Sequence, residues 1–179
     1  MDEVVIGGRR FSKLIDEVRI TEAVNGLARQ LSEDLTDEED VLFLGVLNGA
    51  FLFAADLFRQ ITVSARISFV KLASYEGTES TGRVKELIGW SENVEGKSVV
   101  VVEDIVDSGR TLEMVVGSLA LRRAASVKVV TLLFKPESFR GMSRPDYAAF
   151  VIPPGFVAGY GLDYNGYGRN LPEIYTLIE

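Results

Sequence analysis

The chain has 179 residues, of which 47% are hydrophobic and 25% charged, as expected for one globular domain. It contains no cysteine and no histidine, so disulfides and thiolate metal sites are excluded, and any chemistry must use carboxylates, lysine, hydroxyls and backbone groups. The net charge of −7 argues against sequence-independent binding of nucleic acid, which depends on basic surfaces.

The sequence also argues against a membrane-bound or secreted protein. No stretch approaches the roughly 20 apolar residues that span a bilayer, and Met1-Asp2-Glu3 does not begin a basic region followed by an apolar run. A soluble cytoplasmic protein with no membrane partner is therefore expected. Any metal that it binds should be a hard, oxygen-liganded ion such as Mg²⁺.

The first predicted element is a helix within residues 14–35. Apolar residues recur at helical spacing from Ala23 to Leu31, and Thr21 is predicted as the N-cap residue. An acidic, exposed connection follows. The next run, Val41–Leu47, is continuously apolar, which is typical of a strand buried on both faces.

Asn48-Gly49 ends that strand, and residues 50–58 are predicted as a helix. Residues 63–72 form a second strand candidate. Residues 73–89, rich in Ser, Gly, Thr and Glu, predict a long mobile loop. Loops of this length in compact domains are usually functional or disordered, so this segment is a candidate lid.

The second half continues the alternation of strand and helix. A buried strand is predicted at 98–103, a helix at 111–123 and another buried strand at 127–134. This alternation predicts an α/β fold with a mainly parallel sheet. After Pro136 the pattern changes to short segments rich in Gly and Tyr, which predict a small cap or edge structure on the same domain.

The segment Val99–Leu112 carries the strongest functional signal. Four consecutive valines predict a central strand, and Glu103 and Asp104 arrive at its carboxyl end. In open α/β sheets, ligands bind just beyond those ends. The adjacent carboxylates therefore predict a site for hydroxyl groups or Mg²⁺.

The turn that follows has the composition of a phosphate site. Its backbone N–H groups, the hydroxyls of Ser108 and Thr111 and the helix dipole together suit an anion. Gly109 lets the backbone approach the ligand closely. Asp107 is a poor partner for a phosphate, so it should face elsewhere, towards a group that it can deprotonate.

Simpler interpretations exist for each part of this segment. Paired acidic residues are often a solvated strand end, and a Ser-Gly before a helix is often only a turn with a cap. A phosphoacceptor receiver domain also has acidic residues after a valine-rich strand. Receivers, however, carry them near the chain start and lack the hydroxyl-rich turn. The combination on one central strand favours a functional site.

The same segment resembles the phosphoribosyl pyrophosphate (PRPP) signature of the type I phosphoribosyltransferases. That signature is an apolar strand, two acidic residues, two apolar residues and then Asp-Ser/Thr-Gly-Lys/Arg-Thr. Further segments resemble the hypoxanthine-guanine branch in the family's order, namely 46–50, 71–75, 132–135 and 156–169. The matches extend from about residue 41 to residue 171.

The resemblance implies a mainly parallel, twisted sheet flanked by helices, with a small hood built from terminal segments. It implies a single domain over 1–179, with a mobile lid at about 73–89 and a base-binding hood at about 153–171. The implied reaction transfers the phosphoribosyl group of PRPP to N9 of a 6-oxopurine (hypoxanthine, and guanine as well), with Mg²⁺ as cofactor. A homodimer or homotetramer is expected, without nucleic acid.

An alternative function of another class is that of a regulator with the same fold, which senses PRPP or nucleotides and binds RNA or DNA instead of catalysing. The acidic balance of the chain and the full set of catalytic-looking positions count against it. Within enzymes, the preference among hypoxanthine, guanine and xanthine stays open, because it depends on contacts around C2 of the base.

The resemblance also assigns roles to individual residues. Two carboxylates match those that hold the ribose hydroxyls, directly or through Mg²⁺: Glu103 and Asp104. Asp107 matches the general base near purine N7. The 5′-phosphate cradle is matched by Asp107, Ser108, Gly109, Arg110 and Thr111. The pyrophosphate contacts are matched by Leu47, Asn48, Gly49, Ser74, Tyr75 and Arg169.

Four residues match base-binding positions: Lys135, Phe156, Val157 and Asp163. Lys135 would donate to the exocyclic O6 and select 6-oxopurines over adenine, Phe156 would stack on the base, and the Val157 backbone would contact its edge. Asp163 also matches a second Mg²⁺ contact, so the implied metal ligands are Glu103, Asp104 and Asp163. Without the resemblance, Lys135 would be a snorkelling strand-end lysine and Phe156 an apolar anchor.

The chain departs from the commoner family pattern at two positions. Asn48 stands where the pyrophosphate loop often has Lys, so only backbone donors serve there, and Arg110 stands where Lys is frequent. In the family this loop can hold a non-proline cis peptide. We predict one between Leu47 and Asn48.

Overall fold

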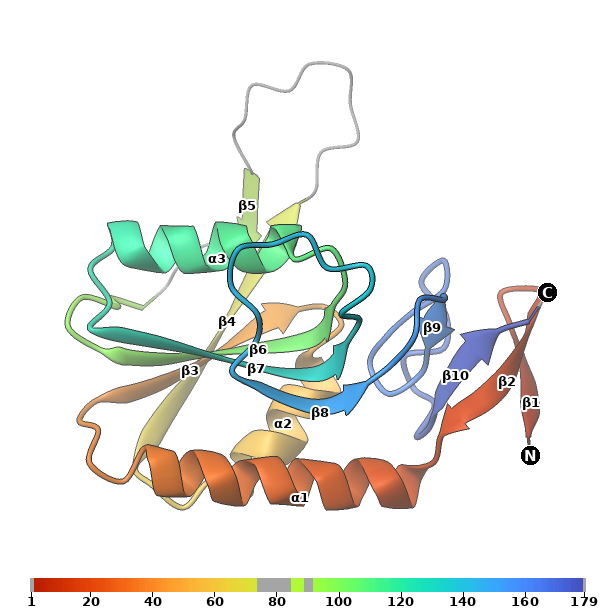
Figure 1. Ribbon diagram of the computed structural model, residues 1–179, viewed down its shortest axis with the longest axis horizontal. Helices are drawn as coiled ribbons and strands as arrows, with labels where there is room; N and C mark the ends of the chain where they lie inside the picture. The colour runs from red at the N-terminus through yellow and green to blue at the C-terminus, as the bar shows by residue number, and fades with distance from the viewer. Residues whose placement is uncertain (1, 74–84, 89–91, 179) are drawn as a thin grey trace.

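The computed structural model describes residues 2–73, 85–88 and 92–178, which form two sheets and three helices (Figure 1). The elements in chain order are β1 (Glu3–Ile6), β2 (Arg9–Ile15), α1 (Glu17–Asp34), β3 (Val41–Leu47), α2 (Phe51–Phe58), β4 (Ala65–Ala73), β5 (Lys85–Ile88), β6 (Ser98–Val106), α3 (Arg110–Leu121), β7 (Ser126–Phe134), β8 (Tyr147–Val151), β9 (Val157–Ala158) and β10 (Ile174–Leu177). In this described part, none of the helices is long and apolar enough to cross a membrane.

The larger sheet has six strands in the order β5-β4-β3-β6-β7-β8. Five of them run parallel, and β5 pairs antiparallel with β4 at one edge. Helix α3 covers one face of this sheet, while α1 and α2 cover the other (Figure 1). The predicted α/β architecture with a mainly parallel sheet is confirmed.

The smaller sheet has the strand order β1-β2-β10-β9, with all neighbours antiparallel. It unites the first strands of the chain with the last ones, and it lies beside one end of the larger sheet (Figure 1). This is the small hood of terminal segments that the resemblance implies. The hairpin β1–β2 was not among the elements predicted from the sequence.

The central strands follow the predicted pattern closely. Strand β3 has the predicted bounds, and its side chains alternate between two cores, with Phe43 facing α1 and α2 and Leu44 facing α3. A strand covered on both faces must be apolar throughout. Strand β6 continues to Val106, three residues beyond the predicted end, because its parallel pairing with β7 extends to Phe134.

Two predictions about local structure were wrong. Thr21 is not the N-cap of the first helix, since α1 begins at Glu17 and the Asp16 carboxylate accepts a hydrogen bond from Arg19 N at 2.9 Å. Thr21 lies inside the first turns and donates to the Glu17 carbonyl instead. The segment 73–89, predicted as a loop from its polar composition, contains strand β5, which pairs with β4. Residues 74–84 and 89–91 of that segment lie outside the described residues.

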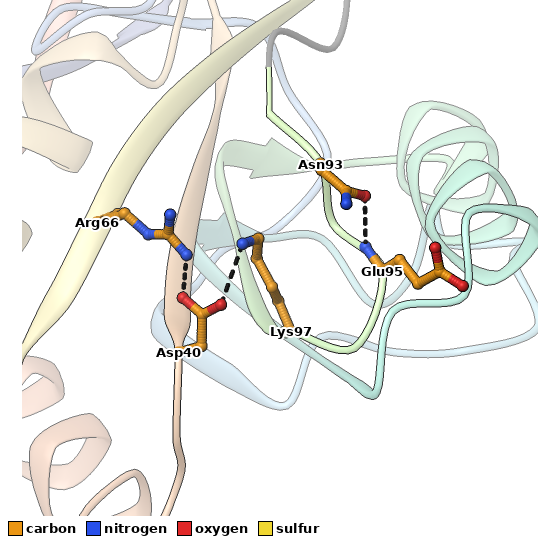
Figure 2. Close-up of polar contacts among 5 residues, drawn as sticks. All are labelled: Asp40, Arg66, Asn93, Glu95 and Lys97. Atoms are coloured by element: carbon orange, nitrogen blue, oxygen red, sulfur yellow. Dashed lines mark hydrogen bonds and ion pairs between the residues drawn. The ribbon is translucent and has the colours of Figure 1, made fainter.

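An ion cluster joins the amino ends of three parallel strands, opposite the end where ligands bind in such folds (Figure 2). Asp40, just before β3, accepts from Arg66 of β4 and, at 3.0 Å, from Lys97, which precedes β6. Nearby, Asn93 Oδ1 accepts from the backbone N–H of Glu95 at 3.1 Å. The hydrogen bond from Lys97, followed by that from Arg66, lowers the pKa of Asp40 below its ordinary value of 3.8.

We expect Asp40→Asn to lower the thermal unfolding midpoint by a small amount at pH 7, because the ion pairs are partly exposed. The stabilisation from charged Asp40 is complete above the ordinary pKa of 3.8 and is lost as pH falls through the lower folded-state pKa. The difference between variant and wild type should therefore shrink below pH 4. A difference that stays constant down to pH 3 would contradict this interpretation.

Candidate active site

Two adjoining cavities lie at the carboxyl ends of the central strands, where the hood meets the larger sheet. The first, of about 350 Å³, is lined by the loop after β3, the end of β6, the start of α3 and two residues of the hood, Asp163 and Arg169. The second, of about 280 Å³, is lined by Lys135, Phe156, Val157 and Leu162. The cavities share four lining residues, namely Asp104, Ile105, Asp107 and Asp163. A ligand can therefore extend from one into the other.

The turn between β6 and α3 presents backbone donors to the first cavity. Gly109 is the N-cap residue of α3 and has a left-handed backbone with φ of 88°. A Cβ atom there would lie 2.5 Å from the Phe139 ring, so only glycine fits. Gly109 makes no side-chain cap bond, and the backbone N–H of Arg110 donates only a long hydrogen bond of 3.5 Å to Ser108 Oγ. The N–H groups and the positive end of the helix dipole are left for an anion.

A loop after β7 supports this turn. Its Arg140 N–H donates to the Ser108 carbonyl at 3.0 Å, and its Met142 N–H donates to Glu113 Oε1 of α3 at 2.8 Å. Phe139 of the same loop packs edge-to-face on Phe134, with ring centroids 5.5 Å apart. Sequence reasoning missed this support, because the loop carries no motif of its own.

The two acidic residues at the end of β6, Glu103 and Asp104, lie in an environment that disfavours negative charge. Glu103 is only 4% exposed, and its Oε1 has no hydrogen-bond partner among the described residues. Burial, with the neighbouring Asp104 charge, raises the pKa of Glu103 well above its ordinary value. Burial also raises the pKa of Asp104 to about 6, although its Oδ1 accepts from Ile105 N at 2.8 Å. Carboxylates with raised pKa values in a cavity, one of them with an oxygen that lacks a partner among the described residues, are typical of ligand sites.

The loop after β3 lies directly against this pair. Its Leu47–Asn48 peptide is cis, as predicted. A Cβ atom on Gly49 would lie 1.5 Å from Asp104 Oδ2, and one on Gly161 would lie 2.3 Å from the Gly49 carbonyl oxygen. Three segments distant in sequence are thus in contact, namely the end of β6, the loop after β3 and the hood. Tyr160 ties the hood further to α2, through a hydrogen bond of 2.7 Å from its hydroxyl to Asp56.

We expect Gly49→Ala to destabilise the protein by about 2 kcal/mol and to abolish ligand binding, because the new methyl group overlaps a carboxylate fixed on the central strand. Gly26→Ala is the matched control, since nothing lies within 4 Å of a Cβ atom at that position of α1. That control should stabilise the protein by roughly 0.5–1 kcal/mol. Urea unfolding measures both changes, and equal behaviour of the two variants would contradict the packing argument.

An ion pair between a buried lysine and a half-exposed aspartate lines the second cavity. Lys135, which directly follows β7, is almost fully buried, and its Nζ lies 2.7 Å from Asp107 Oδ2. Asp107 therefore faces Lys135 and lines both cavities, whereas Ser108 to Thr111 line only the first of them. Phe156 is 46% exposed and lines the second cavity together with the pair. This cavity offers a cation, a carboxylate and an aromatic face.

The hood contributes a second ion pair at the far side of the first cavity. Arg169 Nη2 lies 2.5 Å from Asp163 Oδ1, and Arg169 Nη1 donates to the Gly161 carbonyl at 2.7 Å. Asp163 Oδ2 accepts from Gly166 N at 2.7 Å. Within the described residues, no three acidic side chains gather into a ready-made metal site. A divalent ion here would need oxygen atoms of the substrate as additional ligands.

The structure brings together nearly all the residues predicted from the sequence. Those that line the two cavities are Leu47, Asn48, Gly49, Glu103, Asp104, Asp107, Ser108, Gly109, Arg110, Thr111, Lys135, Phe156, Val157, Asp163 and Arg169. Ser74 and Tyr75 lie outside the described residues. Sequence reasoning gave no role to the apolar lining residues, which are Val46, Ile105, Val106, Leu112, Met114 and Leu162. All of them except Met114 lie inside the segments that carry the family resemblance.

Comparisons with known proteins point to the family that the sequence motifs resemble. The bifunctional protein TilS/HprT of Listeria innocua is 43% identical over 165 residues, which cover 92% of this chain and 25% of that protein. The hypoxanthine phosphoribosyltransferase of Escherichia coli K12 is 41% identical over 168 residues, which cover 92% of this chain and 94% of that protein. This chain therefore spans about a quarter of the Listeria protein and nearly the whole of the Escherichia coli one.

A crystal structure of a hypoxanthine phosphoribosyltransferase from Staphylococcus aureus superposes with a TM-score of 0.87 at 36% identity, covering 93% of this chain and 91% of that one. Residues 13–165 match the family described as the phosphoribosyl transferase domain. These residues contain the larger sheet, the turn into α3 and all the residues that line the two cavities except Arg169. The resemblance inferred from the motifs is confirmed, and the chain belongs to the phosphoribosyltransferase family.

Proposed function

We propose that this protein transfers the 5-phosphoribosyl group of PRPP to N9 of a 6-oxopurine, hypoxanthine or guanine, and releases pyrophosphate. The observation that carries the proposal is the pair of adjoining cavities. One offers a helix start and carboxylates, which suit a ribose phosphate, and the other offers a lysine, a carboxylate and an aromatic ring, which suit a purine. The relatives named hypoxanthine phosphoribosyltransferases support it.

In this proposal the 5′-phosphate binds at the start of α3, where backbone N–H groups, Ser108, Arg110 and Thr111 surround it. The ribose hydroxyls lie against Glu103 and Asp104, whose carboxylate oxygens accept hydrogen bonds from a vicinal diol. Glu103 Oε1, which has no hydrogen-bond partner among the described residues, is costly to bury, so a hydrogen bond from the sugar would relieve that cost.

The carboxylates of the first cavity also suit Mg²⁺. The ion prefers oxygen ligands and is usually held by one or two carboxylates together with substrate phosphates and water. Such oxygens would come from Asp104, Asp163 and Glu103, whose Oε1 has no hydrogen-bond partner in the described part of the chain. When bound, Mg²⁺ would supply positive charge that counters the growing negative charge of pyrophosphate.

The base is proposed to bind in the second cavity, stacked on Phe156 with its edge against the Val157 backbone. The Lys135 ammonium donates to O6, and an exocyclic amino group, itself a donor, would face that ammonium unfavourably. Asp107, 2.7 Å from Lys135, is placed to accept a proton from N7. The C1′–N9 bond forms as the C1′–O bond to pyrophosphate breaks, and the N7 proton passes to Asp107.

The leaving pyrophosphate is proposed to lie beside the backbone donors of Asn48 and Gly49 and the guanidinium of Arg169. The sequence predicts that Ser74 and Tyr75 cover it when a lid over 73–89 closes. We further propose that residues 1–179 act as one domain whose base-binding hood spans about 153–171. A cytoplasmic location and a homodimer or homotetramer also stay predictions.

The direct test is release of pyrophosphate from PRPP with hypoxanthine, guanine, xanthine, adenine or uracil as acceptor. We expect release with hypoxanthine and guanine and little with adenine or uracil. A protein that binds PRPP, releases no pyrophosphate with any base and shifts RNA or DNA on a gel would contradict the proposal and favour a regulator. Adenine as the best acceptor would contradict the role of Lys135.

A further inference from the structure

Three aromatic rings of the hood form a closed cluster behind the second cavity. Phe156 and Tyr164 have ring centroids 5.4 Å apart with planes at 88°, and Phe11 and Tyr164 have centroids 5.6 Å apart with planes at 66°. Phe11 and Phe156 complete the triangle at 6.5 Å and 68°. All three pairs are edge-to-face, the arrangement that the aromatic quadrupole favours.

Only one of the three rings reaches the cavity. Phe156 lines it and is 46% exposed, whereas Phe11 is fully buried, and neither Phe11 nor Tyr164 is among the described residues that line the cavity. Strand β10 fixes the backbone of Phe156, because Leu177 N donates to the Phe156 carbonyl at 2.9 Å. The direction of the ring itself then depends on its ring neighbours, Tyr164 and Phe11.

The N-terminal hairpin holds Tyr164 from the other side. The turn between β1 and β2 contains Gly7, with φ of 55°, and a Cβ atom there would lie 2.9 Å from Cδ1 of the Tyr164 ring. Hydrogen bonds of 2.9 and 3.0 Å join the backbones of Tyr164 and Tyr167. Tyr164 is thus confined between the hairpin and Phe156, although the hairpin is far from both residues in sequence.

We propose that Tyr164 is a positioning residue, which holds the Phe156 ring in the plane needed to stack on a purine and so sets the affinity for the base. The proposal rests on the function proposed above. A ring that is already oriented loses little side-chain entropy when the base binds. Without the Tyr164 ring, Phe156 can rotate about its side-chain bonds, and the base must restrict it. The ribose phosphate contacts lie in the other cavity and should not change.

The test is calorimetric titration of the full chain with IMP and with ribose 5-phosphate, which lacks the base. We expect Tyr164→Leu to weaken IMP binding by about three- to tenfold, the range of a lost aromatic pair, and to leave ribose 5-phosphate binding unchanged. Tyr164→Phe keeps the ring and should bind IMP within about twofold of wild type. Phe11→Leu, which removes the other ring neighbour, should weaken IMP binding in the same direction, and it serves if Tyr164→Leu does not fold.

A double-mutant cycle with Phe156→Leu separates positioning from general damage. If Tyr164 acts through Phe156, Tyr164→Leu should have no further effect on IMP binding once Phe156 has been replaced. An equal loss for IMP and ribose 5-phosphate, or an undiminished effect in the Phe156→Leu background, would overturn the inference. Wild type that binds IMP but catalyses no transfer would contradict the proposed function alone. Wild type that binds no IMP would overturn both.

Discussion

Asp104→Asn should make the ligand-free protein more stable above pH 6 and reduce phosphoribosyl transfer by roughly a hundredfold. Burial raises the pKa of Asp104 from its ordinary 3.8 to about 6. A difference of about two pKa units corresponds to about 3 kcal/mol, which the folded protein loses when Asp104 ionises. Asparagine carries no charge and avoids this cost, but it cannot replace the carboxylate towards ribose and Mg²⁺.

The pH dependence of this gain has a definite sign. Between pH 3.8 and about 6, Asp104 is protonated in the folded protein and ionised in the unfolded chain. The folded state then binds more protons, so the free energy of unfolding falls as pH rises through this window and stays low above it. The advantage of Asp104→Asn should therefore be absent near pH 4 and complete by about pH 7.

Urea unfolding in the presence of a chelator measures the gain at each pH. Asp37→Asn is the control, because Asp37 is exposed and lies in the connection before β3, at the opposite end of the sheet. The control should stay within about 0.5 kcal/mol of wild type at every pH. A gain for Asp104→Asn that does not depend on pH, or a loss of stability at pH 8, would contradict the assignment of a costly buried carboxylate.

Lys135→Ala should raise KM for hypoxanthine by about ten- to a hundredfold and change KM for PRPP little, because a charged hydrogen bond to O6 is lost. The discrimination between hypoxanthine and adenine should fall as well, since the ammonium that opposes an amino group is gone. Asp107 is about half exposed, with a side-chain exposure of 48%, so water can solvate it after the change. A severe loss of stability is therefore not expected.

Lys128→Ala is the matched control for this variant. Lys128 lies on the same strand, β7, but near its amino end, where its Nζ donates to the Asp34 carbonyl at 3.2 Å. Steady-state kinetics with each substrate varied should leave Lys128→Ala close to wild type. Equal increases in both KM values for Lys135→Ala would show that Lys135 is structural and does not contact the base.

The sequence predicted the centre of the fold well, because burial on both faces leaves an unmistakable local pattern. The apolar runs of β3 and β6 illustrate this. The site was predictable for the same reason, since its main motif follows one such strand without interruption. The cis peptide at Leu47–Asn48 was predictable only through the family resemblance, since no periodicity signals it.

The hood could not be predicted in detail, because its structure comes from contacts between the two ends of the chain. Phe11 is fully buried, yet its partners Phe156 and Tyr164 belong to the last segments, so no local pattern marks it as core. The pairing of β2 with β10 likewise joins the two ends of the chain, so no local pattern predicts it. Asp16 could have been predicted as the N-cap residue of α1, because Asp is common at that position, where its carboxylate accepts from the backbone N–H three residues later, here that of Arg19.

The two adjoining cavities should together hold one nucleotide, with its phosphate at the start of α3 and its base beside Lys135 and Phe156. The most direct test is a crystal structure of the protein with bound IMP. We predict phosphate oxygens within hydrogen-bond distance of backbone N–H groups at 108–111, the ribose hydroxyls facing Glu103 and Asp104, and O6 near Lys135. IMP bound elsewhere on the protein, or reversed with its base at α3, would contradict this placement of the phosphate and base sites.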